Sequence, residues 1–233
     1  MADNASSSWC DGWFCIGPTQ TLAEDGDHLS LDLPGRSVTI QNFRGTIVGF
    51  LNVCSHRATQ MRACGRGNGL LRCPYHGWVY NQKGVPAGIP DSDRLFQLTP
   101  ADRESLALPA VAVAQRGAFL FLRLDPKGLS LGEDVAGVDM RLVAERVATV
   151  NLAWTEILAP WIADAEASSG KIIAPNLVTA EADGWLLARY VVPVTPTTNL
   201  VGAALFHSEK TSPDSIPETL AQIWRMTPSN PMK

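Results

Sequence analysis

The 233 residues are enough for one large or two small domains with a substantial core. A hydrophobic content of 45% and a charged content of 18% are ordinary for a soluble globular protein, and a net charge of −4 leaves no basic footprint for nucleic acid. No apolar run approaches the roughly 18 residues that span a bilayer, and residues 1–8 lack the cationic and apolar parts of a signal peptide. We therefore expect a cytoplasmic protein without a membrane or nucleic-acid partner.

The first half of the chain alternates short apolar runs with turns, a pattern typical of antiparallel strands. The glycines at 65, 67 and 69 are expected to loosen the backbone between the second and third runs. The predicted strands are Ser37–Gln41, Thr46–Val53, Leu70–Arg72, Trp78–Tyr80, Ala110–Ala114 and Ala118–Leu124.

The second half begins with a looser connection, 126–139, where we expect a domain boundary. From Arg141 to Ile162 apolar residues recur at spacings of three and four, which favours an amphipathic helix that Pro160 kinks or ends; a strand at Val147–Leu152 is the alternative. The remaining predicted elements are a hairpin of Lys171–Ala180 with Trp185–Thr195, a strand at Leu200–Phe206, a helix at Glu218–Met226 and a frayed tail from Thr227.

Two cysteine–histidine motifs follow the ends of predicted strands. Cys54 and His56 stand in a C-x-H pattern, and after sixteen residues Cys73 and His76 follow in a C-x-x-H pattern. This is the ligand set of a Rieske 2Fe–2S cluster, in which two thiolates hold one iron and two neutral imidazoles hold the other. Structural zinc is the alternative, but zinc fingers usually pair Cys with Cys and His with His. The motifs therefore predict a one-electron carrier.

The other cysteines follow no disulfide pattern. Cys10, Cys15 and Cys64 are odd in number, which favours free thiols in a reducing compartment. Cys10 and Cys15 lie in an aromatic stretch with Trp9 and Trp13, so we expect them to be buried.

The two motifs closely resemble the Rieske domain of aromatic-ring-hydroxylating oxygenase large (alpha) subunits. The likeness runs from Cys54 to Arg57 and from Cys73 to Trp78, and extends over residues 9–125. Ala58 departs from it, since the family usually has glycine there. Thr59 and Tyr75 stand where respiratory Rieske proteins carry two further cysteines, and Trp78 where they often carry a serine. The resemblance therefore implies a potential towards the ~−150 mV end of the Rieske range.

The resemblance also implies the fold class, α+β with mostly antiparallel β-structure. Residues 1–35 would form an N-terminal segment packing on the second domain, residues 36–125 the Rieske 2Fe–2S domain, and residues 126–233 a reduced, helix-grip-like domain of the oxygenase catalytic type. Within that second domain, Asn151–Glu156 and Ile173–Leu177 are similar to segments of the family's catalytic domain.

In that family a mononuclear iron is held by two histidines and a carboxylate. This chain has no histidine between Asn151 and Lys171, and only His28 and His207 remain outside the motifs. His28 is expected as a solvated turn residue, and His207 as a partly buried histidine at a sheet edge. We therefore expect one 2Fe–2S cluster and no mononuclear iron.

The favoured function is electron transfer within a multicomponent oxygenase. The chain would accept electrons from a reductase or ferredoxin and pass them to a mononuclear iron in a partner catalytic subunit, in a homo- or hetero-oligomer, without being catalytic alone. His56 or His76 would face that partner, and Glu156 and Asp164 are the nearest candidates for the family's bridging aspartate. The alternatives are a free-standing Rieske ferredoxin, a self-sufficient oxygenase with an unconventional iron site, and a structural subunit with a vestigial cluster.

Overall fold

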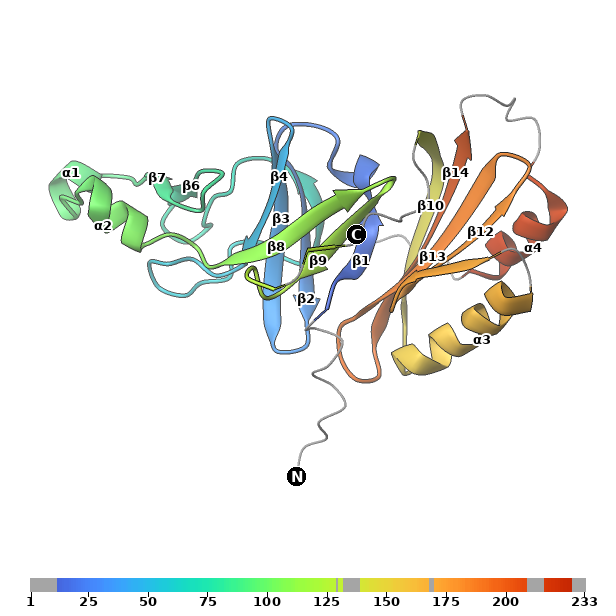
Figure 1. Cartoon of the computed structure of the whole chain (residues 1–233). Coiled ribbons are helices and arrows are strands. Elements are labelled where there is room, and N and C mark those ends of the chain that lie inside the picture. Colours follow the sequence, from blue (N-terminus) through green and yellow to red (C-terminus); the bar gives the residue numbers. More distant parts are fainter. Residues whose placement is uncertain (1–11, 129, 132–138, 168–169, 209–215, 228–233) are drawn as a thin grey trace. The chain divides into compact units, whose positions relative to one another are not determined.

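The computed structural model describes residues 12–128, 130–131, 139–167, 170–208 and 216–227. The chain divides into two compact units, one formed by residues 21–113 and the other by residues 1–20 together with 114–233 (Figure 1). Among the described residues, no helix is long and apolar enough to cross a membrane.

The unit of residues 21–113 is built on an antiparallel sheet with the strand order β8-β4-β3-β2-β5. Its core comes from alternating apolar residues, with Val38 and Ile40 fully buried. Gly49 lies opposite Val111 in the pairing of β4 with β8, where a Cβ atom would come within 2.7 Å of the Val111 side chain. The strands are β2 (Asp27–Leu33), β3 (Arg36–Phe43), β4 (Thr46–Leu51), β5 (Gly65–Asn68) and β8 (Ala110–Arg116), the last three residues of β8 belonging to the other unit.

Smaller elements lie between β5 and β8. Strands β6 (Val79–Tyr80) and β7 (Pro86–Gly88) form a two-stranded sheet, followed by helices α1 (Ser92–Leu95) and α2 (Pro100–Ser105). Helix α2 begins with a capping box, in which the Asp102 amide donates to the Thr99 hydroxyl and the Thr99 amide donates to the Asp102 carboxylate.

One sequence expectation differs from the structure in this unit. The glycine-rich stretch forms strand β5, whereas 70–72 contributes only an isolated bridge between Arg72 and Val79. Glycine suits this strand because β5 lies close to β2: a Cβ atom on Gly67 would lie 2.8 Å from the His28 ring. Strand β2 also pairs with β3 along its length, and both strands lie within the compact unit of residues 21–113.

The other unit contains a five-stranded antiparallel sheet with the order β10-β14-β13-β12-β11. One face carries both helices: Leu158 of α3 is buried against the sheet, and so is Leu220 of α4 (Figure 1). On the opposite face Phe206 meets Phe119, in the pair of β1 with β9. The elements are β1 (Phe14–Pro18), the 3-10 helix η2 (Thr19–Leu22), β9 (Phe119–Arg123), β10 (Met140–Val150), α3 (Trp154–Ala167), β11 (Lys171–Ala174), β12 (Leu177–Ala182), β13 (Trp185–Pro193), β14 (Asn199–Ser208) and α4 (Glu218–Met226), the last two residues of η2 belonging to the unit of residues 21–113.

The predicted helix over 141–162 is wrong for its first half. Residues 140–150 form strand β10, paired with β14, and the helix begins only at Trp154 with Pro160 inside it. Since β10 is an edge strand and largely half-buried, its apolar residues need not alternate strictly. The expected strand 171–180 is divided into β11 and β12 by a break at 175–176. Helix α4 has the predicted bounds, and the α+β, mostly antiparallel fold class is confirmed.

Asn176 ties strand β1 to the five-stranded sheet. Its Oδ1 accepts from the Cys15 amide at 2.8 Å, while its Nδ2 donates to the carbonyls of Cys15 at 2.7 Å and Val191 at 2.9 Å. The side-chain amide thus accepts and donates hydrogen bonds as a backbone peptide group does between two strands. Burial raises the pKa of the Cys15 thiol to about 12, so this cysteine is an unreactive core residue, in agreement with its predicted burial.

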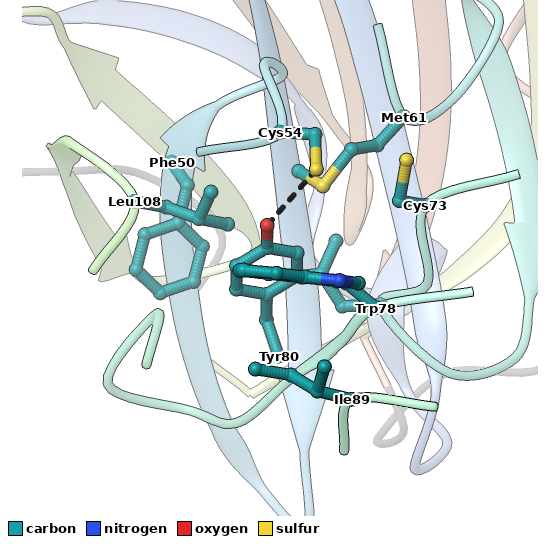
Figure 2. Close-up of a cluster of buried hydrophobic side chains, with 9 residues drawn as sticks. Phe50, Cys54, Met61, Cys73, Trp78, Tyr80, Ile89 and Leu108 are labelled. Atoms are coloured by element: carbon teal, nitrogen blue, oxygen red, sulfur yellow. Dashed lines mark hydrogen bonds between the residues drawn. The ribbon is translucent and has the colours of Figure 1, made fainter. Parts of the chain in front are cut away.

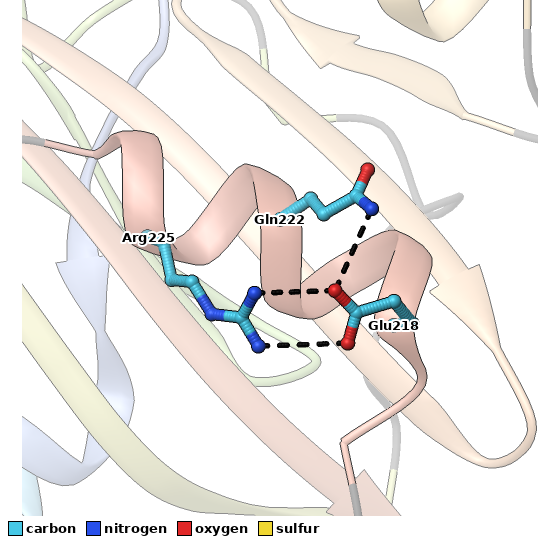
Figure 3. A network of polar contacts seen from close by, with 3 residues as sticks. All are labelled: Glu218, Gln222 and Arg225. Carbon is cyan, nitrogen blue, oxygen red and sulfur yellow. Dashed lines mark hydrogen bonds and ion pairs between the residues drawn. The ribbon is translucent and has the colours of Figure 1, made fainter.

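Helix α4 carries a polar network on its solvent side. The Glu218 carboxylate accepts from Arg225 at 3.1 Å and from Gln222 at 3.5 Å (Figure 3). The paired side chains are about two-thirds exposed, so the ion pair contributes at most about 1 kcal/mol. Leu220 and Trp224, on the buried side, hold the helix to the sheet.

Candidate metal centre

The two predicted ligand loops share one backbone design. The amide of each cysteine donates to the carbonyl five residues later, at 2.8 Å in both loops, and each cysteine carbonyl accepts from the amide four residues later. Those fourth residues, Ala58 after Cys54 and Gly77 after Cys73, both have a positive φ, of 54° and 72°. The loops are therefore equivalent turns, each of which presents a cysteine at its start.

These loops bring the four predicted ligands together. Cys54 and Cys73 are 2% and 1% exposed and belong to one buried cluster. The His56 and His76 rings meet edge to face with their centroids 4.7 Å apart. Figure 2 shows the two cysteine sulfurs at the same end of the buried cluster, near Met61.

The side chains fit a cluster that takes two ligands per iron. The Nδ1 atom of His56 is buried and has no hydrogen-bond partner among the described residues, so it is available as a ligand. Burial lowers the pKa of His56, and the nearby His76 and Arg57 lower it further, which favours the neutral imidazole that binds iron. The described cysteines are free thiols. In the described part of the chain no three His, Cys, Asp or Glu side chains are grouped to hold a single metal ion.

Tyr80 contacts a candidate ligand, which the sequence did not indicate. Its hydroxyl lies 3.0 Å from the Cys54 Sγ and accepts from the Ser55 amide at 3.2 Å (Figure 2). Burial and the contact with Cys54 raise the pKa of Tyr80, so the phenol keeps its proton and can donate it to a thiolate. The available signal was strand alternation, because Trp78 and Tyr80 point the same way from the second loop and both are buried.

We expect Tyr80→Phe to lower the reduction potential of the cluster by about 50 mV. The sulfur gains negative charge on reduction, so losing one donated hydrogen bond, worth about 1 kcal/mol between the two redox states, disfavours the reduced form. Redox titration followed by electron paramagnetic resonance would measure the shift. Tyr75→Phe is the matched control, because the Tyr75 side chain is 63% exposed; an equal shift in both variants would contradict the assignment.

Aromatic side chains surround His56. The Trp78 ring stacks parallel to the imidazole with a centroid distance of 4.7 Å, and Phe96 meets it edge on at 5.7 Å. Trp78 is only 3% exposed, so it fixes the plane of the His56 ring and keeps water from one side of it. Tyr75 lies 4.0 Å from the His76 ring but extends into solvent.

Arg62 supports the segment between the loops. Its guanidinium donates to the Gln41 side chain at 2.7 Å and to the carbonyls of Gly69 and Leu70, just before the second loop. Burial lowers the pKa of Arg62 to about 10, which leaves it charged at neutral pH. Its role depends on contacts far apart in sequence, and no local pattern indicates it.

Ala58 is strained in the first loop. Its positive φ costs an alanine about 1 kcal/mol relative to glycine. Ala58→Gly should therefore raise the free energy of unfolding by about 1 kcal/mol, measured by urea unfolding. The exposed Ala63, which has no such φ, is the control: Ala63→Gly should leave the stability unchanged or lower it.

The other histidines differ from their predicted settings. His28 lies in strand β2 rather than in a turn and is half-buried. His207 is not at a sheet edge: it lies in β14 between Arg141 of β10 and Trp185 of β13, is buried, and packs on the Trp185 ring. The two residues lie in different units of the chain.

The two candidates for a bridging carboxylate each form a polar contact within the chain. Glu156 accepts from the Ala153 amide at the start of α3, and Asp164 pairs with Arg189 at 3.5 Å. Cys64 is exposed. Trp9 and Cys10 lie outside the described residues.

Comparison with known proteins agrees with this geometry. Residues 12–100 match the Rieske 2Fe-2S domain family. Over 133 residues the chain is 24% identical to the carnitine monooxygenase oxygenase subunit of Escherichia coli (strain K12), which covers 56% of this chain and 35% of that protein. Over 126 residues it is 32% identical to the chloroplastic choline monooxygenase of Spinacia oleracea. That alignment covers 53% of this chain and 28% of the plant protein.

The solved structures extend the likeness to both units. The quaternary ammonium Rieske monooxygenase CntA with γ-butyrobetaine aligns with a TM-score of 0.68 at 17% identity, over 93% of this chain and 74% of that chain. Naphthalene 1,2-dioxygenase with indole bound aligns with a TM-score of 0.60 at 15% identity, over 92% of this chain and 70% of the dioxygenase chain. At these identities the likeness concerns the fold.

The fold and the two loops define a protein with a Rieske 2Fe–2S domain. The chain is similar in sequence to oxygenase subunits that contain such a domain, in agreement with the resemblance of its motifs. Its matched segment spans about a third of the length of the curated relatives.

Proposed function

We propose that Cys54, His56, Cys73 and His76 hold one Rieske 2Fe–2S cluster and that the chain is an electron-transfer subunit of a multicomponent oxygenase. The observation that carries the proposal is the pair of equivalent loops, with two buried thiols and an unpartnered, buried His56 Nδ1. Such a cluster accepts and releases one electron at a time.

The chain's own residues set the conditions for that transfer. The cysteine thiolates lie in an apolar cluster that excludes water, and Tyr80 donates to one of them. Trp78 orients the His56 ring, whose Nε2 is left to face a partner. The electron would thus arrive and leave on the histidine side of the loops.

We place the receiving iron in a partner catalytic subunit. The support is the small number of histidines: beyond the four-ligand set the chain has only His28 and His207. One solved quaternary ammonium Rieske monooxygenase is described as giving insight into inter-subunit electron transfer in that protein. In our proposal the Rieske domain, expected at 36–125, carries the electron, residues 126–233 assemble with the catalytic subunit, and the substrate is chosen by that subunit.

Iron content and spectroscopy of the full chain test this proposal. We expect about two irons per chain, a Rieske-type spectrum on reduction and no substrate turnover by the chain alone. A chain that cannot be loaded with a cluster would overturn the cofactor assignment. A third, mononuclear iron with turnover by this chain alone would overturn the partner assignment, and a stable monomer that passes electrons without binding a large subunit would favour a free-standing ferredoxin.

A further inference from the structure

Each candidate ligand loop is closed at its own base by an isolated backbone bridge. Val53 pairs with Gln60 around the first loop, and Arg72 pairs with Val79 around the second. The described cysteines are free thiols, so no disulfide among them joins the two loops. A cluster that takes two ligands from each loop nevertheless requires the loops to keep a fixed separation. That separation is therefore set by noncovalent contacts between the bases of the loops.

The main chain of Arg62 is fixed to the base of the first loop. Its amide donates to the Asn52 Oδ1 at 3.1 Å, and its carbonyl accepts from the Asn52 Nδ2 at 2.7 Å. Asn52 is fully buried and stands two residues before Cys54, the first candidate ligand of that loop. Met61, the neighbour of Arg62, packs in the buried cluster that contains both candidate ligand cysteines. The backbone at position 62 is therefore bound to the first loop.

The side chain of Arg62 reaches the base of the second loop. Its Nη2 donates to the carbonyls of Gly69 at 3.2 Å and Leu70 at 3.0 Å, which lie just before that loop. Strand β3 orients the same guanidinium, because Nη2 also donates to the Gln41 Oε1 at 2.7 Å and Nη1 donates to the Thr39 Oγ1 at 3.2 Å. A single residue thus contacts the bases of both loops, with its backbone at one and its charged group at the other.

Strand β5, which leads into the second loop, is short and open to solvent. Three of its four residues are exposed, although the strand pairs with β2. The Gln41 Nε2 donates to the Gly69 carbonyl at 3.0 Å, so this carbonyl accepts from two side chains. A guanidinium donates in a fixed planar fork, and its charge makes its hydrogen bonds to carbonyls stronger than those of a neutral amide. Arg62 is therefore the stronger of the two side chains that hold the Gly69 carbonyl.

We propose that Arg62 is a positioning residue that clamps the two ligand loops at the separation that the cluster requires. The inference rests on the proposed function and adds the residue that keeps the ligands of the two loops together. Loss of the guanidinium removes this donor from the carbonyls of Gly69 and Leu70 and releases the second loop from the first. The loops then open more often, so the cluster is lost faster while the sheet stays folded.

Loss of the cluster from the purified full chain tests the clamp. The visible absorbance of the cluster is followed after an excess of the chelator EDTA is added. Arg62→Met keeps a long side chain without its donors and should lose the cluster about tenfold faster than the wild type. Arg62→Lys keeps the charge without the planar fork and should be intermediate. Arg44→Met is the matched control, because it makes the same change at an exposed arginine between β3 and β4, and it should alter the rate less than about twofold.

Two further readouts separate positioning from a general loss of stability. In Arg62→Met the amides of Cys73 and Gly77, which donate within the second loop, should exchange with solvent deuterium faster than in the wild type. The amides that pair β2 with β3 should exchange at the wild-type rate. The electron paramagnetic resonance lines of the reduced cluster should broaden, because less fixed loops give a spread of ligand geometries.

Cluster loss at the wild-type rate in Arg62→Met would overturn the clamp. So would an equal acceleration of exchange in the second loop and in the β2–β3 pairing, since that result means a general loss of stability. If Arg62→Met does not fold, the same comparisons in Arg62→Lys decide. Failure of the proposed function is distinct, because the wild type and every variant would then be purified without a cluster, and the exchange of the loop amides would still test the clamp.

Discussion

Cys73→Ser is expected to leave the purified protein without its cluster. A serine hydroxyl keeps its proton at neutral pH and cannot replace a thiolate on iron, so the iron content should fall from about two per chain to near zero. The buried position of Cys73, 1% exposed beside Cys54, offers no water to complete the coordination. Iron analysis and the visible spectrum after reconstitution would measure the loss.

The chain provides a matched control for this substitution. Cys64→Ser makes the same chemical change at an exposed cysteine between the two loops, and it should retain the full iron content. Loss of iron from Cys64→Ser together with retention in Cys73→Ser would show that the ligand set has been misassigned.

The candidate site was predictable from sequence where its chemistry is local. Cysteine and histidine at short spacings are enough to indicate a metal centre, and the fold does bring both motifs together. Tyr80 and Arg62 were missed because their partners lie 26 and 21 residues away, at Cys54 and Gln41. A tyrosine in a strand has no local feature that distinguishes a donor to sulfur from a core residue.

The fold was predictable from sequence where the spacing of apolar residues fits a helix or a strand but not both. Helix α4 has the predicted bounds, whereas β10 carries apolar residues at Val143, Val147 and Val150, spacings that also suit a helix. Strand β5 was missed because Gly65 and Gly67 have low strand propensity, and only the approach of β2 explains them. Both errors arise where a neighbouring strand decides the conformation.

The second large effect is expected at Gly202, in the unit that we expect to bind the catalytic partner. Tyr190 of β13 lies opposite Gly202 of β14, and a Cβ atom at 202 would be 2.0 Å from the Tyr190 Cζ. The ring therefore lies across β14, and its hydroxyl donates to Glu145 of β10 at 2.7 Å. Gly202→Ala must displace this buried ring and break that hydrogen bond, so we expect a loss of about 3 kcal/mol in the free energy of unfolding.

Urea unfolding followed by tryptophan fluorescence would measure this loss. Most of the described tryptophans lie in the same unit as Gly202, namely Trp13, Trp154, Trp161, Trp185 and Trp224. Gly12→Ala is the matched control, since nothing lies within 4 Å of a Cβ atom there, and it should change the stability by less than about 0.5 kcal/mol. In a Tyr190→Ala background, Gly202→Ala should cost much less, because the clash is with the ring itself. An undiminished loss in that background would show that the strain at 202 comes from the backbone and that the Tyr190 ring does not define the site.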